Sequence, residues 1–317
     1  WGNPSSRYEL GTKAAARMKE WRGNVAQALG CLPEELFFTS CGTEGDNWAI
    51  QSALEVNRRR GKHIITTAIE HAAVLEPCRE LERRGYEVTY LEPDRQGNIT
   101  AAQVEEAMRP DTALVSMMLV NNELGAILPV GEVAQVIRRT GCPALLHCDA
   151  VQGFLKIPFS PKKLGVDLLT VSGHKIHGPK GVGFLYVDSH VKLKPIIFGG
   201  GQQGGMRSGT ENVPGIAGIA KAAQIMYDNY DQDIEKLYDL KKCFIEGVKK
   251  IDRVIVNGPD CMDGAPHIVS VSFSGVRSEV LLHSLEDKGI YVSAGSACSA
   301  HKPQPSATLM AMGVPKD

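Results

Sequence analysis

The stretch LLTVSGHK (residues 168–175) places an apolar, β-branched run directly before a serine, a glycine, a histidine and a lysine. A short run of this kind bounded by glycine is typical of a strand buried inside a parallel sheet. Ligands bind beyond the carboxyl ends of strands in open parallel sheets, so Lys175 stands at a candidate binding position. Most lysines are solvated surface residues, so this position alone does not distinguish a ligand-binding lysine from a surface lysine.

Similar apolar runs recur along the chain, and helical patterns such as 72–84 and 101–108 separate most of them. The predicted strands are 63–67, 87–91, 113–119, 144–148, 168–172 and 183–187. This alternation predicts an α/β fold with a mostly parallel sheet covered by helices on both faces. A chain of 317 residues is too long for one small core and suits a large domain plus a smaller one.

The last third of the chain has a different pattern. A long helical stretch covers about 213–251, with a possible break near 228–233, and Asn257-Gly258-Pro259 ends it. After it we expect a strand over 267–273, a helix over 278–288 and a short strand over 291–293. We therefore predict a large domain over 1–250 and an incomplete small domain over 251–317, in a chain trimmed at both ends.

Composition excludes several classes of partner. The formal net charge of −1 gives no electrostatic footprint for nucleic acid or a membrane surface, and no apolar stretch is long enough to span a bilayer. The eight cysteines include no CxxC pair and no Cys/His cluster at zinc spacing. We expect free thiols in a reducing cytoplasm, most of them buried as small hydrophobic residues, and no metal site.

Four polar segments follow predicted strands, at 39–44, 121–123, 149–152 and 172–175. Pyridoxal 5′-phosphate (PLP) needs a lysine for a Schiff base and a carboxylate on its pyridinium nitrogen, and Lys175 and Asp149 supply both groups. Gly42-Thr43 opens a helical stretch that suits a phosphate. The competing interpretation makes Asp149 a helix cap and Gly42-Thr43 an ordinary helix start.

A glycine-rich run, GGGQQGG at 199–205, superficially suggests a dinucleotide fingerprint. Its spacing is wrong, and it leads into MRSGT rather than into an apolar helix, so we reject that interpretation.

Eight strings occur together and in order: GNPSS (2–6), FTSCGTE (38–44), EH (70–71), NNELG (121–125), DAVQ (149–152), SGHKIHGPKG (172–181), GGGQQGGMRSGTEN (199–212) and SAGSACSA (293–300). In these strings the chain resembles the cysteine desulfurases, a branch of the fold-type I PLP enzymes. The resemblance spans the whole chain. It implies a fold-type I PLP-dependent transferase with a seven-stranded, mostly parallel sheet in the large domain and a smaller α+β domain.

The resemblance also assigns roles to residues. Lys175 would form the internal aldimine, Asp149 would pair with the ring nitrogen and Gln152 would contact the ring hydroxyl. His71 would stack on the ring, and Asn122 would lie near the amine and carboxylate of the substrate. The phosphate would be held by Gly42, Thr43, Ser172 and His174, and Gly173 would also bind the cofactor. Thr210 would reach the phosphate of a neighbouring subunit, which implies a homodimer.

Cys298 distinguishes this family from ordinary aminotransferases. By its motif it resembles the thiol that receives sulfur from L-cysteine as a persulfide while L-alanine leaves, and small residues around it suggest a mobile loop. Lys175 would move the Cα proton, and His71 is a candidate proton shuttle. The sulfur would pass to an acceptor such as an iron–sulfur scaffold or a tRNA-modifying enzyme. The alternative for Cys298 is a buried structural cysteine.

Two positions depart from the family pattern, Cys41 in place of a glycine and Gln203 in place of a glutamate. The arginine that binds the substrate carboxylate in this family has no counterpart that we can assign here. Three other functions stay open: a selenocysteine lyase, an aminotransferase, and a non-catalytic sulfur-trafficking subunit.

Overall fold

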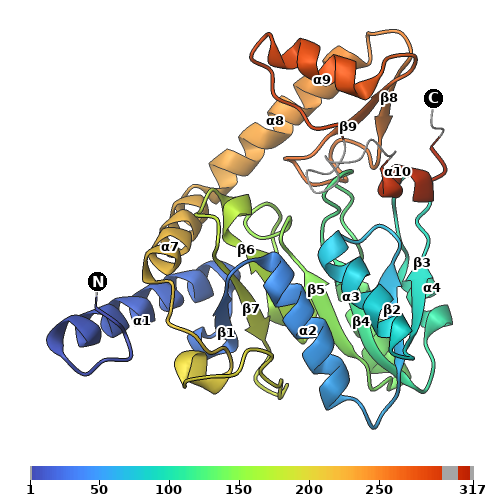
Figure 1. Ribbon diagram of the computed structural model, residues 1–317. Coiled ribbons are helices and arrows are strands. Elements are labelled where there is room, and N and C mark those ends of the chain that lie inside the picture. The colour runs from blue at the N-terminus through green and yellow to red at the C-terminus, as the bar shows by residue number, and fades with distance from the viewer. Residues whose placement is uncertain (1, 295–305, 315–317) are drawn as a thin grey trace.

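The computed structural model describes residues 2–294 and 306–314 of the chain (Figure 1). One sheet is formed by β1 (Leu36–Thr39), β2 (His63–Thr67), β3 (Glu87–Leu91), β4 (Thr112–Met118), β5 (Leu145–Asp149), β6 (Leu168–Ser172) and β7 (Gly183–Val187). Their order is β1-β7-β6-β5-β4-β2-β3. Strands β2 to β6 pair in parallel, whereas β7 lies antiparallel to both β1 and β6. The predicted α/β fold with a mostly parallel seven-stranded sheet is therefore confirmed.

Helices cover both faces of the sheet because neighbouring strand residues point to opposite sides. Ile64 and Leu114 pack with α2 (Gly42–Val56) and α3 (Ala72–Arg83) on one face. Ile65 and Val115 pack in a second core on the other face. That core includes side chains of α1 (Glu9–Leu29), α4 (Ala101–Ala107), α5 (Val130–Thr140) and α7 (Val213–Asp228). A short helix, α6 (Pro161–Leu164), packs beside α5.

The sheet register brings two polar loops side by side. Asp149 at the end of β5 pairs with Thr170 of β6, two residues before Ser172 ends that strand. Helix α2 begins against both loops, since a Cβ on Gly42 would lie 2.9 Å from Cγ2 of Val151 and 3.4 Å from Cβ of Ser172. Three segments that are distant in sequence thus meet at one edge of the sheet.

After α7, which packs in the main core, the chain extends away from the sheet (Figure 1). The long helix breaks at Asn229, inside the predicted interval, into α7 and α8 (Tyr230–Val248). It is followed by the antiparallel pair β8 (Val254–Asn257) and β9 (Ser270–Phe273), by α9 (Ser278–Glu286) and by α10 (Ala307–Ala311). The division at residue 250 remains a prediction.

Three details of this region differ from the sequence-based expectation. The strand expected over 267–273 begins only at Ser270, because the residues at its predicted start contact other segments: His267 Nε2 lies 3.2 Å from Gln152 Oε1, and Ile268 lies against Gly125. Residues 291–293 form no strand. β8 was not predicted because its apolar run is only a few residues long. No helix of residues 2–294 and 306–314 is long and apolar enough to cross a membrane.

Candidate active site

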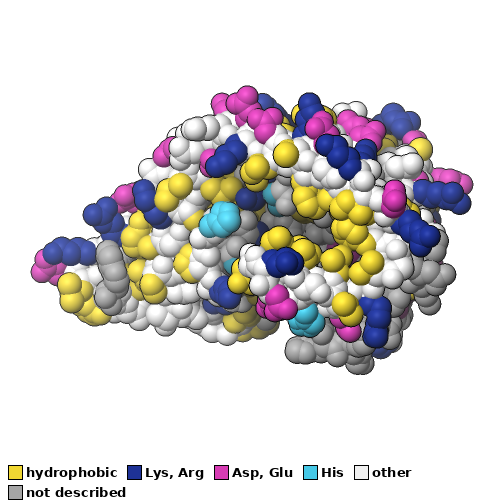
Figure 2. Space-filling model, turned by 90° about the horizontal axis from the view of Figure 1, so that it is seen from above, with side chains coloured by type: hydrophobic (Ala, Val, Ile, Leu, Met, Phe, Trp, Pro, Cys, Tyr) yellow, Lys and Arg dark blue, Asp and Glu magenta, His cyan; other side chains and the backbone are white. Residues whose placement is uncertain are grey.

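Lys175 lies on the short 3-10 helix η2 (Gly173–Ile176) that directly follows β6, and its side chain is exposed. Gly173 allows this close turn, since a Cβ there would lie 3.0 Å from the Val182 carbonyl oxygen and 3.1 Å from Cδ1 of Ile219. The surface above the sheet is hollowed near its middle, and histidine side chains lie around the hollow (Figure 2). The predicted strand–lysine arrangement is therefore present.

Asp149 is a buried acidic group at the site. Its Oδ1 accepts a hydrogen bond from the Val151 N–H at 2.9 Å. Burial raises the pKa of this carboxyl, while the Val151 N–H and the positive charges of His71 and Lys175 act in the opposite direction. A buried carboxylate close to a lysine is the group that a pyridinium nitrogen requires, so Asp149 fits a PLP site.

The predicted phosphate end would be formed by the first turn of α2 and the loop after β6. Ser172 Oγ and His174 Nδ1 are 2.9 Å apart, which orients both groups. Partial burial lowers the pKa of His174, and the charges of Lys175 and Lys180 lower it further. Thr43 is exposed in the first turn of a 15-residue helix, where backbone N–H groups and the helix dipole favour an anion.

His71 and the 121–125 loop form another side of the site. His71 caps α3, and its Nδ1 accepts from the Ala73 N–H at 3.1 Å, which fixes the orientation of the ring. Asn121 donates from Nδ2 to the Ile69 carbonyl at 2.9 Å and ties the two loops together. Asn122, the residue predicted to lie near the substrate, follows it and is half-buried.

Buried titratable residues beneath this site were given no role from the sequence. Burial raises the pKa of Glu70 to about 8, although its Oε1 accepts from Thr67 Oγ1 at 2.8 Å and from Met118 N–H at 2.9 Å. Burial lowers the pKa of His147 to about 3 and makes it neutral between Ser116 and Thr170. His147 precedes Asp149 by two positions and so shares its face of β5; this spacing was the available signal.

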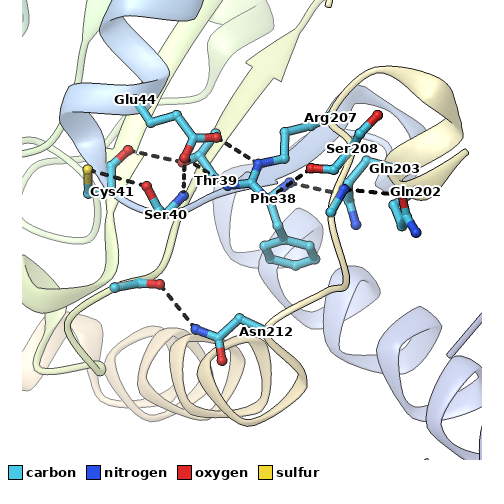
Figure 3. Close-up of polar contacts among 12 residues, drawn as sticks. Phe38, Thr39, Ser40, Cys41, Glu44, Gln202, Gln203, Arg207, Ser208 and Asn212 are labelled. Carbon is cyan, nitrogen blue, oxygen red and sulfur yellow. Dashed lines mark hydrogen bonds and ion pairs between the residues drawn. The ribbon is translucent and has the colours of Figure 1, made fainter. Parts of the chain in front are cut away.

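The glycine-rich segment 199–212 packs against β1 and α2 (Figure 3). Arg207 forms an ion pair with Glu44, with Nε 2.8 Å from Oε1. The Oε1 of Gln203 accepts from Nη2 of Arg22 at 2.7 Å and from the Phe38 N–H at 3.1 Å. Thr210 on this segment is exposed. Gln203 thus acts as an uncharged acceptor that anchors the segment.

Other sequence-based expectations have mixed outcomes. Cys298 lies outside the described residues; Ser306, described beyond it, donates from Oγ to the Glu123 carboxylate in the 121–125 loop. The expectation that most cysteines are buried is wrong. Among the seven described thiols, all free, only Cys78 and Cys148 are buried and Cys243 is exposed. Cys41 is half-buried at the start of α2, where its Sγ lies 3.7 Å from Ser40 Oγ.

The chain matches the family model described as aminotransferase class-V over residues 1–314. The cysteine desulfurase IscS of Methanosarcina thermophila is 43% identical over 317 residues, which cover all of this chain and 78% of that protein. The putative cysteine desulfurase IscS 1 of Bacillus subtilis is 42% identical over 312 residues, covering 98% of this chain and 82% of that protein.

Solved structures agree with this comparison. A NifS-like protein matches with a TM-score of 0.92 and 40% identity, covering 99% of this chain and 83% of that one. A structure described as SspA in complex with cysteine matches with a TM-score of 0.84 and 34% identity, covering 100% of this chain and 88% of that one.

The chain therefore belongs to the aminotransferase class-V family. Its relatives narrow the class further, to the cysteine desulfurases, and they confirm both the resemblance and the enzyme class predicted from the sequence.

Proposed function

We propose that Lys175 binds PLP and that the chain uses this cofactor to remove sulfur from L-cysteine, which leaves as L-alanine. The observation that carries the proposal is the meeting of Lys175, the buried Asp149 and the first turn of α2 at one edge of the sheet. When bound, PLP supplies an electron sink for the charge that develops at the substrate Cα. The likeness to SspA in complex with cysteine supports L-cysteine as the substrate.

Each site residue of this chain would contact a different part of PLP. Asp149 would hold the ring nitrogen, Gln152 the ring hydroxyl, and His71 one face of the ring. The first turn of α2, with Gly42 and Thr43, would hold the phosphate together with Ser172 and His174, and Gly173 would also bind the cofactor. This arrangement would leave the Lys175 amine free to take the Cα proton once the substrate amine replaces it.

Cys298 would complete the sulfur transfer. Its thiolate attacks the substrate sulfur, the carbon–sulfur bond breaks with its electrons moving toward carbon, and a proton completes L-alanine. Cys298 then holds a persulfide, whose outer sulfur passes to an acceptor protein such as an iron–sulfur scaffold. Ser306 supports this assignment, because its hydrogen bond to Glu123 brings the chain back beside Asn122 eight positions after Cys298.

A second copy of the chain would complete the site. Thr210 is exposed near the end of the glycine-rich segment 199–212, and Phe198, the residue directly before this segment, is 81% exposed. A homodimer that covers this surface would bring Thr210 to the phosphate of the other subunit. The free state of the seven described thiols supports a reducing, cytoplasmic location.

Absorbance spectra of the purified protein, with and without L-cysteine, test the proposal. The wild type should be coloured, should change its spectrum on adding L-cysteine, and should release sulfide and L-alanine in the presence of a thiol. Lys175→Ala should lose the stable visible band and turnover, whereas Cys298→Ala should keep the band and lose sulfide release. A colourless wild type, or sulfide release that survives Cys298→Ala, would contradict the proposal.

A further inference from the structure

His267 reaches the proposed cofactor site from a segment 115 residues away in the sequence. Its Nε2 lies 3.2 Å from Oε1 of Gln152. In the proposed function, Gln152 contacts the ring hydroxyl of PLP, so any role of His267 at the cofactor rests on that proposed function. Neither the sequence motifs nor the roles implied by the family resemblance include His267.

The backbone on either side of His267 is fixed to the wall of the site. Ala265 N–H donates to the Gly125 carbonyl at 2.8 Å, and the Ala265 carbonyl accepts from Nζ of Lys241 at 2.8 Å. Gly125 has a φ of +75°, and a Cβ there would lie 3.2 Å from Cβ of Ile268. The 264–268 segment therefore presents the His267 ring to Gln152 from a position set by several independent contacts.

The surroundings keep the His267 ring neutral. Burial is the largest cause that lowers its pKa to about 3, and the positive charges of Lys156, Lys241 and Lys175 lower it further. A neutral imidazole carries one N–H. Nδ1 is buried and has no hydrogen-bond partner among residues 2–294 and 306–314, and the nearby charges are those of three ammonium groups. The proton therefore belongs on Nε2, opposite the Gln152 oxygen.

We propose that His267 is a positioning residue whose Nε2–H holds the carbonyl oxygen of Gln152 and thereby turns the Gln152 amide N–H groups toward the ring hydroxyl of bound PLP. An amide has its oxygen and its NH₂ on opposite sides, so holding the oxygen from one side presents the donors on the other. The ring oxygen is electron-rich, and a donor directed at it stabilises the charge it carries. Without His267, the Gln152 amide would be free to turn over.

The visible absorption band of bound PLP changes with pH, and the pH at which half of this change has occurred is its midpoint. Because a donor at the ring oxygen stabilises the charge there, this midpoint reports on the Gln152 contact. His267→Leu keeps a similar volume and removes the donor; by loosening Gln152 it should raise the midpoint by roughly 0.5 to 1 pH unit. His267→Gln restores an N–H donor at the reach of Nε2 and should return the midpoint to near the wild-type value. Ile268→Ala keeps the Cβ that lies against Gly125 and removes only the side-chain atoms beyond it. It should therefore lower stability without moving the midpoint.

Gln152 itself completes the test. Gln152→Ala should raise the midpoint, and adding His267→Leu to it should change nothing further, because the two residues act through one contact. Additive shifts in the double variant, or a His267→Leu midpoint equal to that of the wild type, would overturn the proposal.

A measurement on the cofactor-free protein separates this inference from the proposed function. The ¹⁵N shifts of the His267 ring should show a neutral ring protonated at Nε2 from pH 5 to 8, and the Nε2 proton signal should move in Gln152→Ala. A ring protonated at Nδ1, or an Nε2 signal unaffected by Gln152→Ala, would reject the role of His267. A wild type that binds no PLP would instead reject the proposed function.

Discussion

Arg207 and Glu44 form a two-pronged ion pair, with Nε 2.8 Å from Oε1 and Nη2 3.0 Å from Oε2. The pair joins the glycine-rich segment to the first turn of α2, which is the proposed phosphate site (Figure 3). Burial raises the pKa of Glu44, but hydrogen bonds from Arg207 and Ser40 outweigh it, so the pKa lies below its ordinary value. The pair therefore stays charged at neutral pH.

Removing this pair should loosen both the fold and the phosphate site. We expect Arg207→Met to lower the free energy of unfolding by about 1.5–3 kcal/mol, because it leaves the largely buried Glu44 carboxylate without its charged donor. PLP should also bind more weakly. Urea unfolding and an absorbance titration with PLP measure the two effects. Arg207→Lys, which keeps the charge and loses the fork, should fall in between; equal values for all three proteins would contradict this role.

A methyl group on Gly42 should disturb the phosphate site more than the fold. The new Cβ would lie 2.9 Å from Cγ2 of Val151, so the start of α2 must shift. We expect Gly42→Ala to weaken PLP binding by about tenfold, equivalent to about 1.4 kcal/mol.

Gly23→Ala is the matched control for this change. A Cβ on Gly23 meets nothing within 4 Å in the part of the chain that the structure describes, and this residue also lies in a helix, α1. The variant should gain about 0.5–1 kcal/mol of stability and bind PLP as the wild type does. Equal PLP affinities in the two variants would show that the close approach of Gly42 has no role in binding.

Glu70 should give the cofactor-free protein a characteristic pH dependence. Its pKa is about 8 in the fold, against 4.5 for the ordinary group. Between these values the folded protein holds a proton that the unfolded chain has released, so stability falls as pH rises, by up to about 1.4 kcal/mol per pH unit. Glu70→Gln imitates the protonated acid and should flatten this slope in urea unfolding at pH 5 to 8. An unchanged slope would place the titrating group elsewhere.

Two substitutions of Gln203 should show whether stability depends on its hydrogen-bond acceptor or on its being uncharged. Gln203→Leu leaves Arg22 and the Phe38 N–H without their shared acceptor and should cost about 2–4 kcal/mol of stability. Gln203→Glu keeps the acceptor and adds a charge opposite Arg22, so it should be at least as stable as the wild type at neutral pH. Thermal or urea unfolding compares them; a Gln203→Glu variant as unstable as Gln203→Leu would refute this assignment.

The sheet and the positions of the candidate site residues at its edge could be predicted from the sequence because their signals are local. Lys175 and Asp149 each follow a short apolar strand, and Gly42 opens a helix. The contact of His267 with Gln152 could not be predicted, since it joins segments 115 residues apart that show no shared pattern. The strand expected from residue 267 begins only at Ser270 for the same reason: the residues at its predicted start contact other segments.

The prediction that most cysteines are buried was wrong for a different reason. Composition describes the average environment of a residue type and says nothing about particular positions, so it did not separate the buried Cys78 from the exposed Cys243.

The Asn121 side chain links the two loops that follow β2 and β4 at the site. This side chain donates to the Ile69 carbonyl and accepts from the Glu123 and Leu124 N–H groups, both at 2.9 Å. The loops after β2 and β4 therefore open to solvent only as one cooperative unit. Although Glu123 and Leu124 lie in a loop, their amide protons should exchange with solvent as slowly as those of the neighbouring strands.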